Sequence, residues 1–150
     1  MLINQLIGSS DPERVLINIK NVDGGGSVTT GMGACIVFTA ASGDGIGAVK
    51  ATKALSRTFA GVANGDIAIN ALGLVTAYGY AASVLISQSV GSWTITAGDC
   101  LQTGGTGAFT SVLVLENLST MCSRYVVQLG AISDTISNPL QYVKGWVRAL

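Results

Sequence analysis

Residues 59–80 constrain the fold more than any other stretch of the chain. They read FAGVANGDIAINALGLVTAYGY, with short apolar runs divided by glycine and asparagine. Asn64-Gly65-Asp66 predicts a turn, because Asn and Gly both tolerate positive φ. A second break is expected at residues 70–73, followed by a strand to residue 80. None of these side chains is chemically reactive, so the stretch predicts shape rather than catalysis.

Similar turn-forming residues recur along the whole chain, which contains 20 glycines. Turn signals recur roughly every 8–12 residues, a spacing typical of all-β barrels and sandwiches. The expected strands cover residues 15–22, 34–39, 74–80, 81–87, 93–96, 126–129 and 141–150. One short helix is expected over residues 48–59, which are rich in Ala, Lys and Leu. Residues 112–130 stay ambiguous, because helical spacing precedes the strand-like run at 126–129.

Two of the expected strands have clearly different faces, because successive side chains of a strand point in opposite directions. In the first strand, Ile17, Ile19 and Asn21 share one face. In the last strand, one face carries Tyr142, Lys144, Trp146 and Arg148. The sequence therefore predicts a mainly β, small β-barrel or sandwich-like domain with one or two short helices and an N-terminal arm.

The arm is expected over residues 1–14, and residues 15–150 are expected to form a single β-rich domain. A chain of 150 residues has the length of one domain. The arm ends in a break at residues 9–12, and its apolar residues are Leu2, Ile3, Leu6 and Ile7. These residues can pack on a neighbouring subunit or on the chain's own core, and the sequence leaves both open.

The charge content favours association. Charged residues make up 11% of the chain and sum to zero net charge, against roughly 25% in ordinary soluble domains. A neutral, sparsely charged surface promotes contact with other chains. Trp93 and Trp146 are candidate interface residues together with the four apolar arm residues, since Trp is enriched at interface hot spots. Trp is also an ordinary core residue, and that alternative stays open.

The same composition argues against several partners. Phosphate binding needs clustered Lys and Arg, whereas the eight basic residues are scattered, so nucleic acid is not expected. Lys50, Lys53 and Arg57 share a face of the expected helix, as a solvated face or a small anion patch. No apolar run is long enough for a membrane span, and no signal peptide is expected. Cys35, Cys100 and Cys122 are too widely spaced to suggest a zinc site or disulfide framework.

Catalysis has little support in the residue types. The chain lacks histidine, which removes the commonest general base and metal ligand. Four aspartates stand beside glycine, where Asp stabilises turns: Asp23, Asp44, Asp66 and Asp99. The 26–31 glycine pattern lacks the P-loop Lys and Ser/Thr, and the 43–47 pattern lacks the dinucleotide spacing. We expect no enzyme, cofactor, metal or small-molecule substrate.

Several motifs resemble the capsid cement (decoration) proteins of tailed bacteriophages. The similar residues are Phe59-Ala60-Gly61-Val62-Ala63, Asp66-Ile67-Ala68, Gly73-Leu74-Val75 and Tyr78-Gly79. The segments at 96–101 and 143–150 resemble the family's downstream Ala-Gly-Asp turn and closing strand. The resemblance covers residues 42–101 and, more loosely, the C-terminus.

The resemblance implies a structural virion protein on the outer face of the phage head, made in the host cytoplasm. It would bridge neighbouring major capsid protein subunits, often as a homotrimer, and stabilise the shell. The alternatives are another virion part, such as a minor coat or tail component, and a small nucleotide-binding protein.

Overall fold

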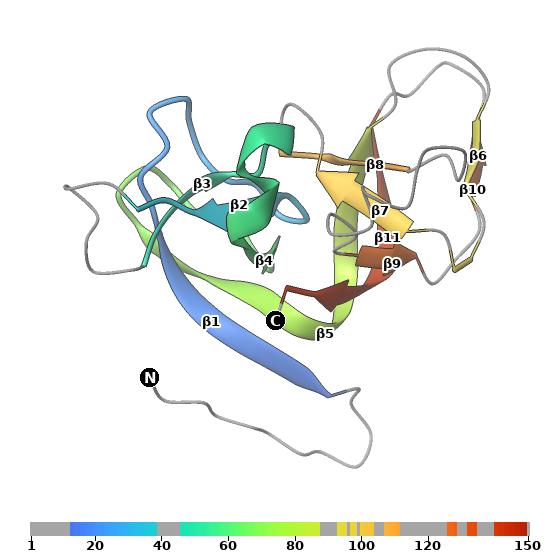
Figure 1. Ribbon diagram of the computed structural model, residues 1–150, viewed down its shortest axis with the longest axis horizontal. Helices are drawn as coiled ribbons and strands as arrows, with labels where there is room; N and C mark the ends of the chain where they lie inside the picture. The colour runs from blue at the N-terminus through green and yellow to red at the C-terminus, as the bar shows by residue number, and fades with distance from the viewer. Residues whose placement is uncertain are drawn as a thin grey trace.

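A computed structural model describes residues 13–38, 46–87, 93–95, 97–98, 100–103, 107–111, 126–128, 132–134 and 140–149. Within these ranges the chain is mainly β, as the sequence predicts (Figure 1). The strands are β1 (Arg14–Asn21), β2 (Gly33–Ile36), β3 (Gly47–Lys50), β4 (Phe59–Ala63), β5 (Leu72–Ser87), β6 (Trp93–Ile95), β7 (Cys100–Thr103), β8 (Phe109–Ser111), β9 (Val126–Gln128), β10 (Ile132–Asp134) and β11 (Leu140–Arg148). The helical element is the 3-10 helix η2 (Lys53–Thr58).

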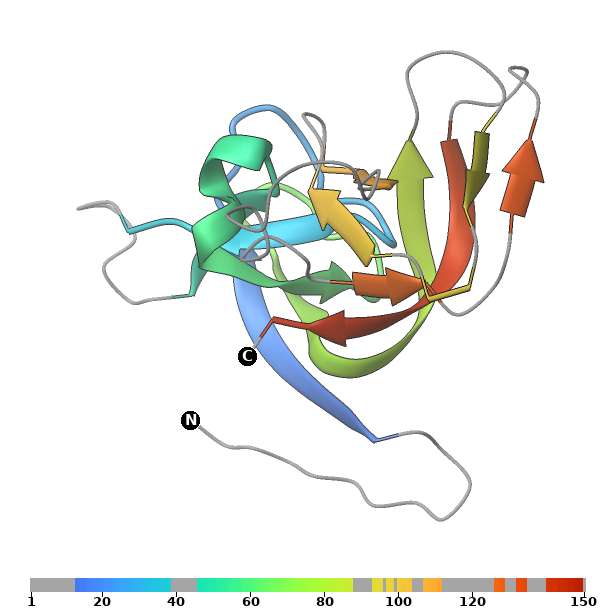
Figure 2. The same ribbon diagram turned by 45° about the vertical axis from the view of Figure 1, so that its right-hand side comes forward.

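Nine strands form one sheet that closes on itself twice. In the first ring, β1 pairs with β3, β3 with β2, β2 with β4, β4 with β5, and β5 with β1. In the second ring, β5 pairs with β11, β11 with β9, β9 with β7, β7 with β8, and β8 with β5. The expected barrel-like or sandwich-like sheet thus consists of two rings of strands that share β5. Strands β6 and β10 form a separate two-stranded ribbon at the periphery (Figures 1 and 2).

Strand β5 belongs to both rings because it bends at Gly79. Its first half pairs with β1, and its second half pairs with β11. Gly79 is the point where they meet, since it lies opposite Arg14 on one side and Val147 on the other. Its φ of 98° favours glycine, and a Cβ atom there would overlap the carbonyl group of Glu13. The two strands expected at 74–80 and 81–87 are therefore one bent strand of 16 residues.

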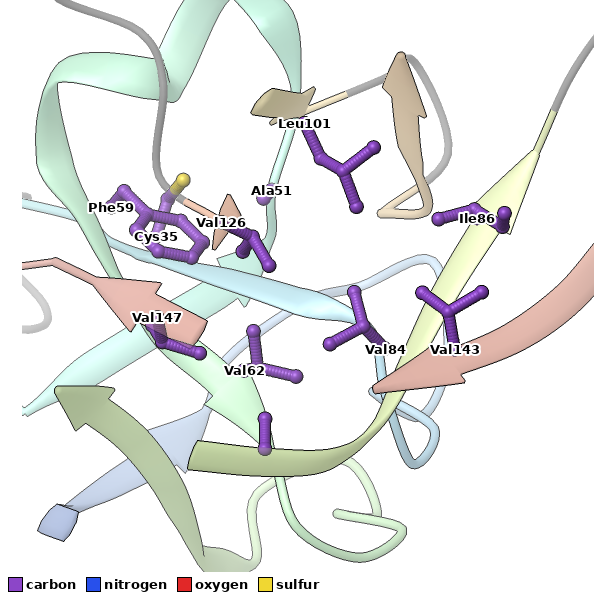
Figure 3. Close-up of a cluster of buried hydrophobic side chains, with 11 residues drawn as sticks. Cys35, Ala51, Phe59, Val62, Val84, Ile86, Leu101, Val126, Val143 and Val147 are labelled. Atoms are coloured by element: carbon purple, nitrogen blue, oxygen red, sulfur yellow. The ribbon is translucent and has the colours of Figure 1, made fainter. Parts of the chain in front are cut away.

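Strands β2 and β4 form a wall between two hydrophobic cores. Cys35, Phe59 and Val62 point into the larger core, which Figure 3 shows, with residues from β5, β7, β9 and β11. Ala34 and Ala63 point to the opposite side, into the smaller core inside the first ring. Because side chains alternate along a strand, each wall strand supplies both cores. All five residues of β4 are buried for this reason.

The buried polar residue Asn21, at the end of β1, forms hydrogen bonds with two neighbouring loops. Its amide nitrogen donates to the carbonyl oxygens of Ile67 (2.9 Å) and Gly26 (3.2 Å). Its side-chain oxygen accepts a hydrogen bond from the backbone N–H of Asp23 (2.9 Å). A buried amide is costly unless its groups are paired, and here both ends of the amide are used. Asn21 therefore ties two loops to the first ring.

The helix expected over residues 48–59 is largely wrong. Residues 48–50 belong to β3, and only Lys53–Thr58 turn, as the 3-10 helix η2. Ala48 in β3 and Ala51 just after it are fully buried, one in each hydrophobic core, so these alanines serve packing and not a helix. The shared basic face is lost as well, because the Nζ of Lys50 in β3 donates to the carbonyl oxygen of Gly25 (3.2 Å).

The turn at 64–66 lies between β4 and β5, as expected, but its physical reason differs. Among the described residues, the one non-glycine residue with positive φ is Asn70 (62°), in the second break. Asn64 instead accepts a hydrogen bond from the hydroxyl group of Thr76 (2.8 Å).

No helix in the described part of the chain has the length and apolar character to cross a membrane.

We predict that Gly79→Ala lowers the free energy of unfolding by at least about 2 kcal/mol, since strained backbone alone costs about 1–3 kcal/mol. The control is Gly65→Ala, because no atom lies within 4 Å of the Cβ position there. That variant should stay within about 0.5 kcal/mol of the parent. Urea unfolding followed by tryptophan fluorescence measures both, and equal effects would contradict the role of Gly79 in the bend.

Candidate interaction face

The outward side of β11 carries exposed aromatic and basic residues. Burial alternates along the strand as the sequence predicts: Val143 and Val147 are buried, whereas Tyr142, Lys144 and Arg148 are exposed or partly exposed. Tyr142 has 59% of its surface exposed, which is high for an aromatic residue. The strand is held in place by pairing with β5 along nearly its full length. Its outward residues therefore stand on a rigid support.

Strand β5 adds two tyrosines to the same side. Tyr80 lies opposite Trp146, and Tyr78 lies opposite Arg148, and directly opposed residues of an antiparallel pair share a face. The rings of Tyr78 and Trp146 meet edge to face, with centroids 5.8 Å apart and planes at 83°. This is a favoured aromatic arrangement, and it fixes the Trp146 ring while leaving the residue partly exposed. We call these six residues the aromatic face: Tyr78, Tyr80, Tyr142, Lys144, Trp146 and Arg148.

The aromatic face is electrostatically one-sided. Lys144 and Arg148 are its charged members, and neither β5 nor β11 contains an acidic residue. Exposed Arg14 lies opposite Gly79 at the neighbouring end of β1, directly after exposed Glu13, so this end of β1 places one charge of each sign beside the face. Tyr, Trp and Arg are the residue types enriched at protein interfaces and their hot spots. The arrangement suits contact with a surface that carries carboxylates.

Of the six interface residues expected from the sequence, the structure describes the side chain of one. Trp146 lies on the aromatic face. The backbone of Trp93 lies in β6, and its side chain falls outside the described part. Leu2, Ile3, Leu6 and Ile7 precede the described residues. Sequence reasoning missed Tyr78 and Tyr80, although their spacing of two on an expected strand was the available signal.

The aspartates expected in turns do stabilise loops, as the two that the structure describes show. Asp23 accepts a hydrogen bond from the backbone N–H of Gly25 (2.7 Å) and another from that of Lys50 (3.1 Å). Asp66 accepts two hydrogen bonds from Thr30, from the backbone N–H (2.7 Å) and the hydroxyl group (2.9 Å). Asp66 therefore joins loops far apart in sequence, and these hydrogen bonds lower the pKa of its carboxyl group. Asp44 and Asp99 lie outside the described residues.

No reactive constellation comes together in the described residues. They contain no group of three or more His, Cys, Asp or Glu side chains that could hold a metal ion. Both glycine patterns lead into strands, since β2 follows the 26–31 pattern and the 43–47 pattern runs into β3. A phosphate-binding loop instead needs a helix N-terminus after the glycines. Of the described cysteines, Cys35 is buried and Cys100 is partly buried.

The strand rings define the described part of the chain as a mainly β fold. Its sequence matches no protein-family model and no curated protein. Among solved structures, its fold is similar to the crystal structure of the head fiber gp8.5 N base in bacteriophage phi29, with a TM-score of 0.50. The two sequences are 15% identical, and the match covers 91% of this chain and 95% of that chain. At this identity the likeness establishes a shared fold.

We predict that Cys35 resists thiol reagents in the native protein. Burial raises the pKa of its thiol from 9.0 to about 11, although hydrogen bonds with Thr52 and Thr58 partly oppose the increase. Labelling by a disulfide reagent near pH 8 should be at least about 100-fold slower than in urea, because the thiolate is the nucleophile. Rapid native labelling of Cys35, identified by mass spectrometry, would contradict its burial.

The raised pKa also gives a pH dependence. The unfolded chain releases the Cys35 proton first, so stability should fall as pH rises from about 9 to about 11. Unfolding curves across this range, compared with those of Cys35→Ala, measure the effect. The variant should lose this part of the slope, and identical slopes would exclude Cys35 as its source.

For Asp66 we predict the opposite pH dependence, with stability falling as the pH is lowered. Its folded pKa lies below the ordinary 3.8, because Thr30 donates two hydrogen bonds to the carboxylate. The contribution to stability is therefore present above about pH 4 and is lost as pH falls through the lowered pKa. Thermal unfolding between about pH 5 and pH 2 should show that Asp66→Asn loses less stability on acidification than the parent. A parallel decline of both proteins would remove Asp66 from this account.

Proposed function

We propose that this chain is a structural virion protein, a capsid cement or decoration protein that binds the outer face of a phage head. It bridges neighbouring major capsid protein subunits and stabilises the shell. The observation that supports a structural role at the phage head is the likeness to a head fiber base across nearly the whole of both chains. The resemblance of residues 42–101 to cement proteins is the reason for proposing the cement role. The self-association expected of this class is a homotrimer.

The aromatic face is the proposed capsid-binding surface. Its partner is a carboxylate-bearing surface of the major capsid protein, because the face carries Lys144 and Arg148 and no acidic residue. Many equivalent sites on an icosahedral shell turn a modest contact into tight overall attachment when the protein is multivalent. A sheet closed into rings suits this task, since its face keeps its shape without any bound ligand.

A second candidate is the base of a head fiber or another minor virion component. The likeness to the head fiber base favours this candidate over a soluble enzyme. Loss of the protein has a different effect in each of the two virion roles. Removing a cement protein weakens the shell, whereas removing a fiber base leaves shell strength unchanged. The small nucleotide-binding alternative loses its support, because both glycine patterns run into strands.

The decisive experiment is sedimentation of native particles, with this protein quantified against the major coat protein. A fixed ratio in the particle fraction is expected. Its release by mild denaturant should leave shells that rupture at lower temperature or lower internal pressure. Intact stability after release would favour the fiber-base role, and recovery only in the soluble fraction would exclude both virion roles.

We predict that the double variant Lys144→Glu, Arg148→Glu binds stripped particles at least about 10-fold more weakly, because it reverses the charge of the aromatic face. Arg57→Glu is the matched control, since Arg57 is an exposed basic residue on η2. Both variants should unfold at the same temperature as the parent. Equal weakening by the two would point to general charge attraction and away from this face.

A further inference from the structure

Strand β1 has an open backbone edge within the described part of the chain. It pairs with β5 from Arg14 to Lys20, but with β3 only at Lys20 and Asn21. The N–H group of Lys20 donates to Ile46 (2.8 Å) on the β3 side, whereas that of Asn21 donates to Ala71 (3.0 Å). Since backbone groups alternate along a strand, the N–H groups of Leu16 and Asn18 point to the β3 side too. No described strand lies there to accept them.

Exposed apolar side chains lie on the outer face of β1 and of its partner β5, and Leu16 is the one on β1 itself. Leu72 is 65% exposed, Leu74 is 45% exposed and Leu16 is 38% exposed. Leu74 lies opposite Asn18 on the β1–β5 pair, and Leu16 is two residues further along the same face. An open edge beside exposed apolar side chains is a template for pairing with another strand. We call the open side of residues Arg14 to Ile19, with the exposed side chain of Leu16, the β1 edge.

The chain supplies a segment that fits the β1 edge. Residues 1–12 immediately precede it, contain Leu2, Ile3, Leu6 and Ile7, and carry no charged side chain before Asp11. Twelve extended residues reach about 40 Å, whereas the six residues of the edge span about 20 Å. The arm is therefore long enough to cross a gap and still pair along the whole edge.

The position of β1 and the charge content of the chain favour another copy as the partner of the arm. The start of β1 lies at the periphery of the molecule, where β5 bends away from it (Figures 1 and 2). The neutral, sparsely charged chain favours association with other copies.

We propose that the N-terminal arm of one copy adds as a strand to the β1 edge of a second copy and covers Leu16. Main-chain hydrogen bonds to Leu16 and Asn18 supply affinity, and an apolar side chain of the arm packs on the neighbouring Leu16. Each copy carries both an arm and an edge, so this head-to-tail contact forms a ring when the rotation between copies closes and an open filament when it does not. The inference deepens, and rests on, the self-association part of the proposed function.

The acceptor side is tested with Asn18→Pro in the full chain. Proline removes the N–H group on the open side and leaves the pairing with β5, because the N–H groups that serve β5 belong to the alternate residues. Asn18→Thr is the matched control, since it keeps the N–H group. Light scattering on purified protein should show that the parent and Asn18→Thr are oligomeric. Asn18→Pro should associate at least about 10-fold more weakly, since it loses a main-chain hydrogen bond of the added strand.

The donor side is tested with Leu6→Asp, which places a charge among the apolar arm residues. Gln5→Asp adds the same charge at a polar arm position and is the matched control. Leu6→Asp should dissociate the oligomer, and Gln5→Asp should preserve it. This pair also decides the question if Asn18→Pro fails to fold, because the arm precedes both cores.

Three outcomes overturn the inference. The first is a parent protein that is monomeric at about 100 μM, which would place the arm on its own chain or on the capsid. The second is an oligomer that survives both Asn18→Pro and Leu6→Asp. The third is a split result, in which both variants fold but only one of them, Asn18→Pro or Leu6→Asp, weakens association. Because these measurements use purified protein without capsids, their failure is distinct from a failure to bind particles.

Discussion

The bend of β5 at Gly79 is the constraint on which both rings depend. A straight strand of 16 residues would extend about 53 Å, far beyond the radius of gyration of about 15 Å expected for a chain of this size. The strand must therefore bend or leave the core. Glycine at the bend lets β1 approach from one side and β11 from the other, so that one strand serves two closed pairing systems. A side chain at this position would force β1 and β5 apart.

The wall of β2 and β4 places mainly small residues toward one core and larger ones toward the other. Toward the first ring it presents Ala34, Ala60 and Ala63, and toward the second it presents Phe59 and Val62. Small side chains on one face allow the five strands of the first ring to close tightly, while large ones on the other face fill the wider core. Because the same backbone lines both cores, a shift that relieves one of them disturbs the other.

The sequence predicted the structural features that depend on residues close together in the chain. The alternating faces of β1 and β11 follow directly from residues such as Ile19, Trp146 and Val147. The helix over 48–59 failed because alanine favours a helix in isolation, whereas Ala48 lies in β3 and both Ala48 and Ala51 are fully buried. Ring closure could not be predicted, because it pairs Arg14 with Gly79, 65 positions further along the chain. For the aromatic face, the alternation of β11 was visible, but its partnership with Tyr78 and Tyr80 required the register.

The two rings also differ in when they can form during synthesis. All strands of the first ring lie before residue 88, whereas the second ring needs β11, which ends at Arg148. The first ring is thus complete in sequence 61 residues before the second, from Ser87 to Arg148, an interval of about 3–12 s at typical translation rates of about 5–20 residues per second. Until these later strands are made, the side of the wall that carries Phe59 and Val62 lacks the side chains of β7, β9 and β11 that pack against it in the folded protein. The topology therefore leaves the larger core incomplete during synthesis after every strand of the first ring has been made.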